Sequence, residues 1–280
     1  MPSKWIANPW KRLSLQRYPI RLSTRLPDRD KWQKASLDIQ FTDAIEDRFL
    51  FHVVLNCFGH YEIRDAANKL ISGLPITSPG SSQAAEQNLD LVERLVRFKH
   101  LEKFTNSCSL TNSPFRESFR VELVTPSRKF KPGDEVIEVR HWEKEEDNIT
   151  LEIHNMGSST LYVYALDLGP RWQVENIWGG CGEVINARDP ADPWLYSGMT
   201  SRVLKMTVPD NMIECGHREC DDILKVFVTT QPTTFTSWQM PEIEQPNRRE
   251  HSPSQVDQAR EGENLEDWVA LNFYIRTKLR

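Results

Sequence analysis

The amino-acid sequence predicts a mainly β fold, a two-sheet antiparallel β-sandwich with one covering α-helix and long loops. About ten short segments alternate apolar and polar residues with the period of two that is typical of a half-buried strand. Turns rich in Pro and Gly separate these segments. Only one segment, residues 83–105, repeats its apolar residues at helical spacing. Many strands and one helix are typical of sheets packed face to face.

The first 35 residues are expected to form a basic, partly disordered N-terminal arm. They hold nine Lys or Arg and two Asp, a net charge of +7 in a chain whose total is −5. Such an arm can contact nucleic acid, anionic lipid or the acidic remainder of the chain. Its Arg-rich, acid-poor composition also fits an organelle transit peptide. We favour the simplest interpretation, a solvated extension, and do not predict nucleic-acid binding.

Residues 36–240 are expected to form one β-rich domain that includes the helix at 83–105. Its centre is the segment 148–178, which predicts three consecutive strands. The middle strand, starting at Leu161, is apolar on both faces and is therefore predicted inside a sheet that is covered on both sides. Lys131-Pro132-Gly133-Asp134 predicts a type II turn, with Gly at the position that needs a positive φ.

The helix and the C-terminal part of the chain complete this prediction. Leu91, Leu95, Phe98 and Leu101 form the apolar stripe of the helix, and Ser82 is a candidate N-cap. Further strands are expected at 203–208 and 223–228. Residues 241–266 are polar and are expected to form a disordered loop. Residues 267–280 are expected to form a C-terminal strand that returns to the core.

Composition and motifs exclude several classes of protein. The sequence has no apolar run long enough to span a bilayer and no secretory signal at its N-terminus. Five Cys without dense spacing favour a reducing, cytoplasmic location over a secreted disulfide scaffold. P-loop, GxGxxG and HExxH motifs are absent from the sequence, and no cofactor is predicted.

Cysteine and histidine offer the sharpest chemical alternative. Cys215, His217 and Cys220, with Cys181 as a distant fourth ligand, are candidate metal ligands, because thiolate and imidazole suit tetrahedral zinc. The same segment is also compatible with a reactive or disulfide-forming pair, or with an ordinary loop, which we favour because only one close pair of ligands is present. Cys57 lies in an apolar strand pattern and is expected to be buried.

A nucleophilic Cys181 is a second alternative. Its Gly-rich neighbours can supply backbone N–H groups for an oxyanion hole. It requires a His base, for which His60, His154 and His217 are the candidates, and sequence alone does not place them.

Tryptophan residues are candidate interface residues. Trp172, Trp178, Trp194 and Trp238 can line a groove that contacts protein. At strand spacing such residues more often belong to the core, so both interpretations remain open.

Several segments together resemble a known family. These are LEIHN at 151–155, LYVYALDLGPRWQVENIW at 161–178 and DDILKVFVTTQPTTF at 221–235. They are similar to the region C-terminal to the protease domain in fungal caspase-like proteins of peptidase family C14. FHVVLNCFGHYEIRDAANKLISGLPI at 51–76 and LVERLVRFKHLEKF at 91–104 resemble parts of that region in the same order. The resemblance covers roughly 36–240 and the last strand, and it implies a β-rich accessory module beside a protease.

The catalytic residues of that family cannot be placed on this sequence. Caspase-type proteolysis needs a His after a strand and a Cys in a QACxG-like or DxCHSG-like turn, and neither pattern occurs here. Residues 1–35 are too short for a caspase domain.

We therefore expect a non-catalytic accessory module that acts through contacts with protein, including a caspase-like protease domain in cis or in trans. The alternatives are a thiol- or zinc-dependent enzyme centred on Cys181, Cys215, His217 and Cys220, and a remnant of a longer protease gene.

Overall fold

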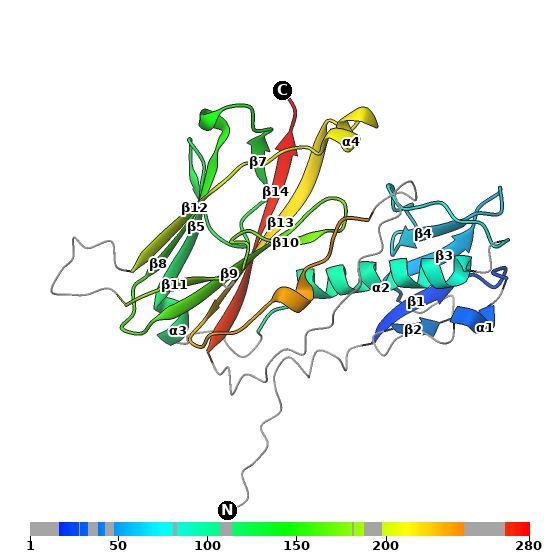
Figure 1. Cartoon of the computed structure of the whole chain (residues 1–280), viewed down its shortest axis with the longest axis horizontal. Helices are drawn as coiled ribbons and strands as arrows, with labels where there is room; N and C mark the ends of the chain where they lie inside the picture. The colour runs from blue at the N-terminus through cyan, green and yellow to red at the C-terminus, as the bar shows by residue number, and fades with distance from the viewer. Residues whose placement is uncertain are drawn as a thin grey trace, which may run out of the picture. The chain divides into compact units, whose positions relative to one another are not determined.

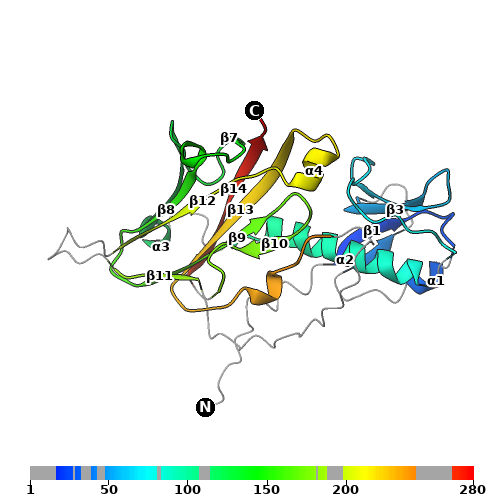
Figure 2. The same ribbon diagram turned by 45° about the horizontal axis from the view of Figure 1, so that its top comes forward.

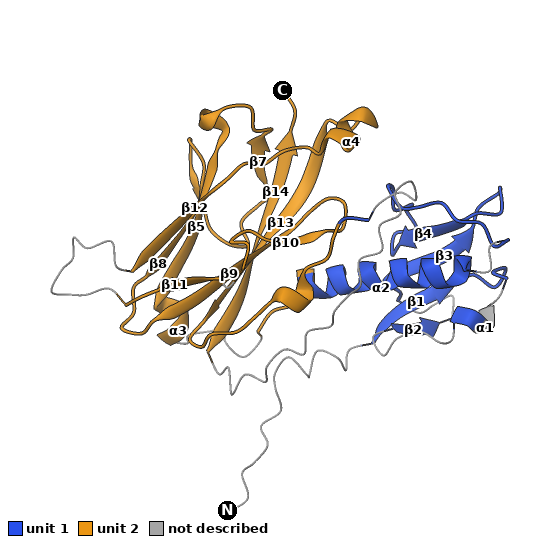
Figure 3. Ribbon diagram, viewed as in Figure 1, with its two compact units in different colours: residues 1–101, 242–256 blue, residues 102–241, 257–280 orange. Residues whose placement is uncertain are grey.

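The computed structural model describes residues 17–27, 29–32, 39–42, 48–80, 83–106, 114–180, 182–187, 198–243 and 267–280. These residues are mainly β, with three sheets and one long helix, which confirms the predicted fold class (Figure 1). The chain divides into two compact units. Unit 1 comprises residues 1–101 and 242–256, and unit 2 comprises residues 102–241 and 257–280 (Figure 3).

Unit 1 contains a four-stranded sheet with the strand order β2-β1-β3-β4. Its elements are β1 (Tyr18–Leu22), α1 (Arg29–Trp32), β2 (Ile39–Thr42), β3 (Phe51–Leu55), β4 (Tyr61–Asp65) and α2 (Ala84–Lys103). Strand β1 pairs in parallel with both β2 and β3, and β3 and β4 form an antiparallel hairpin. The sequence prediction placed β2, β3 and β4 in the single domain at 36–240 and did not predict a separate sheet that includes β1.

This sheet contradicts two expectations: a basic arm at 1–35 without regular structure, and a single domain at 36–240. Residues 18–22 form an interior strand whose Tyr18, Ile20 and Leu22 are buried, and the Trp32 side chain is fully buried. The physical reason is that the basic residues, such as Arg21, lie between the apolar ones and face outward. Because residues 1–35 are rich in Lys and Arg, the alternation of apolar and polar residues at 18–22 was not interpreted as a strand. Residues 1–16 lie outside the described part.

Helix α2 confirms the expected helix at 83–105. Of its predicted apolar stripe, Leu95, Phe98 and Leu101 are buried and Leu91 is half-buried. The helix runs across the four-stranded sheet (Figure 1). The Tyr18 hydroxyl and His100 Nδ1 are 2.6 Å apart and form a hydrogen bond, which joins the helix to β1. The predicted N-cap Ser82 lies outside the described residues.

Unit 2 contains two sheets that lie face to face (Figure 1 and Figure 2). The larger sheet has the order β10-β9-β13-β14-β7, with β11 also paired to β9, and the smaller sheet has the order β12-β8-β5-β6. The larger sheet comprises β7 (Ile137–Arg140), β9 (Leu161–Leu168), β10 (Val174–Asn176), β11 (Glu183–Ile185), β13 (Glu219–Thr229) and β14 (Trp268–Lys278). The smaller sheet comprises β5 (Phe119–Val124), β6 (Lys129–Phe130), β8 (Ile149–Asn155) and β12 (Met199–Leu204). The described residues of unit 2 also form the short helices α3 (Pro114–Glu117), η3 (Glu145–Asp147), α4 (Asp210–Glu214) and η4 (Thr236–Trp238).

The core of unit 2 lies between the two sheets. One cluster of buried residues joins Val121 of β5 and Leu151 of β8 to Val163 of β9, Val226 of β13 and Phe273 of β14. In each strand these residues alternate with residues of the opposite face, as the period of a strand requires. The pairing within both sheets is antiparallel except between β14 and β7, which are parallel.

The strands expected at 148–178 are confirmed as β8, β9 and β10. The type II turn at Lys131 is also confirmed: Gly133 has a φ of 80°, and Asp134 N donates to Lys131 O at 3.2 Å. Two other bounds differ from expectation. Strand β12 begins at Met199 and ends at Leu204, and β13 is longer than the segment expected at 223–228.

The outer face of the larger sheet is covered by aromatic side chains, which confirms that β9 is enclosed on both sides. Phe227 of β13 is fully buried and stacks on Phe235, with ring centroids 4.3 Å apart. Phe104 stacks on Trp268 at 4.9 Å and on Trp238 at 5.9 Å. Because Phe104, Phe235 and Trp238 come from segments outside the sheet strands, the cover was not visible as a periodic pattern.

Two further expectations concern the C-terminal part. Strand β14 confirms the returning strand at 267–280. In the expected polar loop, Ile243 is buried and residues 244–266 lie outside the described part. None of the described helices combines the length and apolar character needed to cross a membrane.

Candidate functional site

The outer face of the smaller sheet gathers the most chemically varied side chains among the described residues. We define the outer face as Arg120, Glu122, Lys129, Glu152, His154, Met199, Ser201 and Val203. Their neighbours in the strands, such as Val121 and Leu151, point into the core. The strand period therefore places all eight on the opposite side of the sheet.

Strand register brings the charged members of the outer face together. Glu122 of β5 lies directly opposite Glu152 of β8, and Arg120 lies opposite His154. On the other side of β8, Met199 of β12 lies opposite His154, and Ser201 lies opposite Glu152. Opposite residues in an antiparallel pair have Cβ atoms about 4.5–5.5 Å apart, so their side chains interact.

The two facing carboxylates are balanced by cations. Lys129 Nζ lies 2.8 Å from Glu152 Oε2 and 3.7 Å from Glu122 Oε2. Arg120 Nε lies 3.5 Å from Glu122 Oε2. Like charges directly opposite each other destabilise a sheet, and Lys129 between the two carboxylates offsets this repulsion.

The same contacts shift the pKa values of Glu152 and Lys129. The hydrogen bond from Lys129 lowers the pKa of the Glu152 carboxyl, and nearby His154 adds to the effect. The bond to Glu152 raises the pKa of Lys129. Glu152 is therefore a carboxylate, and Lys129 a cation, at neutral pH.

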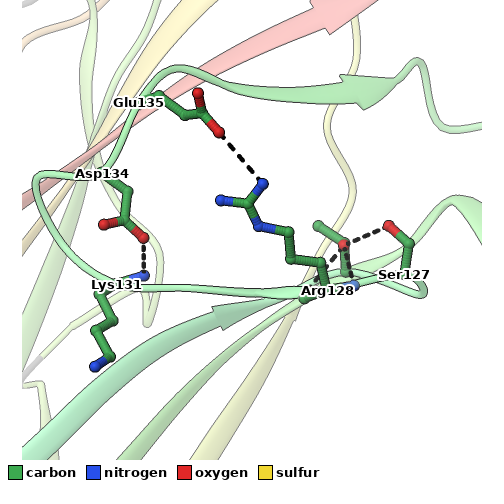
Figure 4. A network of polar contacts seen from close by, with 6 residues as sticks. Ser127, Arg128, Lys131, Asp134 and Glu135 are labelled. Carbon is green, nitrogen blue, oxygen red and sulfur yellow. Dashed lines mark hydrogen bonds and ion pairs between the residues drawn. The ribbon is translucent and has the colours of Figure 1, made fainter.

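A polar network that includes Arg128, Lys131 and Asp134 surrounds strand β6 (Figure 4). Thr125 Oγ1 accepts a hydrogen bond from Arg128 N at 3.2 Å and closes the turn between β5 and β6. Arg128 forms an ion pair with Glu135 at 3.2 Å, and Lys131 N donates to Asp134 Oδ2 at 2.7 Å. These bonds hold the two-residue strand β6 beside β5, where the Lys129 side chain reaches across to β8.

His154 completes a group of metal-binding donors. Its Nε2 atom is buried, has no hydrogen-bond partner within the described chain, and lies 3.8 Å from Glu152 Oε2. The ligand atoms of Glu122, Glu152 and His154 all lie within 4.8 Å of one another, and they are the one such group of three in the described ranges. His154 was predicted as a candidate base, but the group was not predicted. The spacing of residues along the sequence does not reveal the register of β5 on β8.

Strand β12 forms an apolar border of the outer face. Met199 is 40% exposed and Val203 is 53% exposed. Among the described residues β12 pairs only with β8, so it is an edge strand. Asn155, which is buried, fixes this edge: its backbone N–H donates to Gly198 O at 2.7 Å, and its side-chain amide donates to Ile185 O at 3.0 Å.

Cys215, His217 and Cys220 lie elsewhere in unit 2, and they are not a group of possible metal ligands among the described residues. Cys215 follows α4 and is exposed, as is His217. Cys220 is buried in β13, where its Sγ lies 3.6 Å from Asp222 Oδ2 and 3.7 Å from Thr207 O. Cys181 lies outside the described residues. The geometry of Cys215, His217 and Cys220 therefore does not favour a shared metal, because one thiol is enclosed while the other two side chains face solvent.

Cys220 belongs to a buried acidic cluster. Burial raises the pKa of the Cys220 thiol, and Asp222 adds to this rise. Burial also raises the pKa of Asp222 to about 8, with a contribution from Asp167, and raises the pKa of Asp167 to about 6. At neutral pH the thiol is protonated and is a weak nucleophile.

Cys57 corrects another expectation, since it is exposed. Strand β3 ends at Leu55, and Asn56 Oδ1 accepts hydrogen bonds from Phe58 N and His60 N, both at 2.9 Å. The apolar pattern at Cys57 continues past the strand into this turn, which turns its side chain outward.

The candidate interface tryptophans occupy different settings. Trp172 lies in the turn between β9 and β10 with a φ of 66°, and Trp178 is half-buried against the core. Trp238 stacks on Phe104 in the aromatic cover. Trp194 lies outside the described residues. The interface role of these residues remains a prediction.

No protein-family model matches the chain. A search of curated proteins also found no match.

Proposed function

We propose that the chain is a non-catalytic interaction module that binds protein through the outer face, by the addition of a partner strand to β12. The observation that carries the proposal is the edge strand β12, whose Met199 and Val203 are exposed on the same side as the charged group of β5 and β8. An unpaired strand edge offers backbone N–H and C=O groups to another chain, and side chains at alternate positions then give specificity.

The side chains of β12 indicate the chemistry of the partner. Met199 and Val203 favour apolar residues on the outer side of an added strand. Arg202 lies on the other side of β12 and is exposed. An inward-facing charge discourages unselective pairing at a sheet edge. A partner strand with an acidic residue facing Arg202 would compensate this charge, so we propose an extended segment that is apolar on one side and acidic on the other.

The proposed class of partner is a caspase-like protease domain, in cis or in trans. It rests on the sequence resemblance of residues 36–240 to the region that follows such domains. The module would position the protease or select its partners, and it would contribute no catalytic residue.

The test compares two substitutions of matched exposure in the whole chain. Val203 is 53% exposed on β12, and Val136 is 47% exposed outside the smaller sheet. Binding to a purified caspase-like protease domain would be measured with the wild-type chain, Val203→Lys and Val136→Lys. We expect Val203→Lys to weaken binding by at least about tenfold, or about 1.4 kcal/mol, and Val136→Lys to leave it unchanged.

Two results would contradict the proposal. Equal binding by wild type and Val203→Lys would exclude β12 as the contact. Absence of binding by the wild-type chain would exclude this class of partner, and capture from cell extract with the same two variants would then test β12 alone.

A further inference from the structure

The outer face contains donors for a metal ion as well as an edge for a strand. Glu122, Glu152 and His154 place two carboxylates and one imidazole within 4.8 Å of one another. All three project from the paired strands β5 and β8, where backbone hydrogen bonds fix their spacing. Sites built on paired strands hold their ligands more precisely than sites on loops.

The His154 side chain is 23% exposed, and its Nε2 atom lies toward Glu152 without a hydrogen bond. His154 Nε2 is buried and has no hydrogen-bond partner among the described residues, although a buried polar atom normally has one. The nearest acceptor in the group, Glu152 Oε2, lies 3.8 Å away, beyond hydrogen-bond range. Two ligand atoms that share a tetrahedral metal at about 2.0–2.2 Å lie roughly 3.3–3.6 Å apart, so a small side-chain movement suffices.

We propose that Glu122, Glu152 and His154 bind a divalent transition-metal ion of the zinc class. The imidazole favours such ions over Mg²⁺ and Ca²⁺, which prefer oxygen ligands. Three protein ligands leave a fourth tetrahedral position for water or for a ligand from another molecule. The site does not depend on strand addition at β12, so it stands or falls separately from the proposed function.

Lys129 competes with the metal for the same carboxylates. Its ammonium group lies against Glu152 and near Glu122, where a metal ion would place its positive charge. The Lys129 side chain is 54% exposed and long enough to turn into solvent. Metal binding therefore exchanges one cation for another between two carboxylates that repel each other.

The competition between Lys129 and the metal ion predicts opposite changes in zinc affinity for the ligand variants and for a Lys129 variant. Zn²⁺ alone would be titrated by calorimetry into the full chain, Glu152→Gln, His154→Gln and Lys129→Gln. We expect one Zn²⁺ per wild-type chain. The two ligand variants should weaken binding by at least about tenfold, the loss found when even the outer shell of a metal site is disturbed. Lys129→Gln should strengthen binding, because it removes the competing cation.

Cys215→Ala is the control, because Cys215 belongs to the other set of candidate metal ligands, and it should bind Zn²⁺ as the wild type does. Co²⁺ absorption of the wild type and of Lys129→Gln provides a second readout of imidazole and carboxylate ligands if a ligand variant does not fold. Zinc binding that survives His154→Gln, or that is lost in Cys215→Ala, would overturn the proposal. Absence of binding even by Lys129→Gln would also overturn it, and would leave an ion-pair network only.

Discussion

The two sheets of unit 2 share one core but differ in their outer faces. The outer side of the larger sheet is enclosed by the rings of Phe104, Phe227, Phe235, Trp238 and Trp268. The outer face of the smaller sheet carries five charged or titratable residues and an apolar edge. The first arrangement excludes water and stabilises the fold, whereas the second gathers ionisable side chains that range from buried Glu122 to half-exposed Lys129.

Two lysines, one on each sheet, show the same difference between the outer faces. Lys225 lies under the aromatic cover, fully buried, and its Nζ donates to Glu102 O at 3.2 Å and to Asn272 Oδ1 at 2.9 Å. Burial lowers the pKa of Lys225 to about 7, although Glu102 partly offsets the effect. Lys129, on the outer face, remains exposed beside two carboxylates. Lys225 is fixed inside the fold, whereas Lys129 can leave its carboxylates and be replaced by another cation.

The largest expected effect comes from removing a ring of the aromatic cover. Phe227→Ala should lower the free energy of unfolding by about 3–5 kcal/mol, because the side chain is fully buried and the sheet cannot collapse around the space. Met199→Ala, on the outer face, should cost well under about 1 kcal/mol, as surface changes usually do. Urea denaturation measures both, and equal losses would remove the distinction between the faces.

The next effect concerns Asp167 near the end of β9, which is half-buried, and Asp222 near the start of β13, which is buried. The pKa values of Asp222 and Asp167 are raised to about 8 and about 6 in the folded chain, so the folded state binds more protons than the unfolded state above about pH 4. The contribution of these two groups to stability should therefore be highest in acid. It should fall as pH rises from about 4, until about pH 6 for Asp167 and about pH 8 for Asp222, by up to about 1.4 kcal/mol per pH unit for each proton. Asp222→Asn should flatten the upper part of this decline in thermal unfolding at stepped pH. An unchanged slope would show that Asp222 is ionised in the fold.

Lys225 should give a pH dependence of the opposite sign. Its folded pKa of about 7 lies below the ordinary lysine value of about 10.4, so between these values the unfolded state binds more protons. The contribution of Lys225 to stability is thus present at high pH and lost as pH falls through about 7. Relative to wild type, Lys225→Met should be most stable near pH 6 and least stable near pH 10. A difference that does not vary with pH would mean that Lys225 keeps its charge when buried.

The smallest effect on stability is expected on the outer face itself. Lys129→Gln removes an exposed ion pair, and added salt should reduce its already small effect on thermal unfolding. The same change is expected to strengthen zinc binding, so stability and binding should separate at this residue. A large loss of stability that salt does not alter would assign Lys129 to the fold.

Local pattern predicted the sandwich but not the sites. Alternation was sufficient for β8, and a run apolar on both faces was sufficient for β9, because each strand carries its own apolar pattern. It was insufficient for β1, where the apolar residues of a short strand lie among basic ones. Glu122 and His154 are 32 positions apart in the numbering and meet only through the register of β5 on β8, which depends on the whole sheet.

Amide hydrogen exchange on the full chain, alone and in complex with its protein partner, tests the central claim most directly. Exchange in β12, residues 199–204, should slow in the complex because an added strand would take up its edge N–H groups. Strand β7, at the far edge of the larger sheet, should be unchanged. Protection elsewhere with β12 unaffected would contradict the assignment of the outer face as the binding surface.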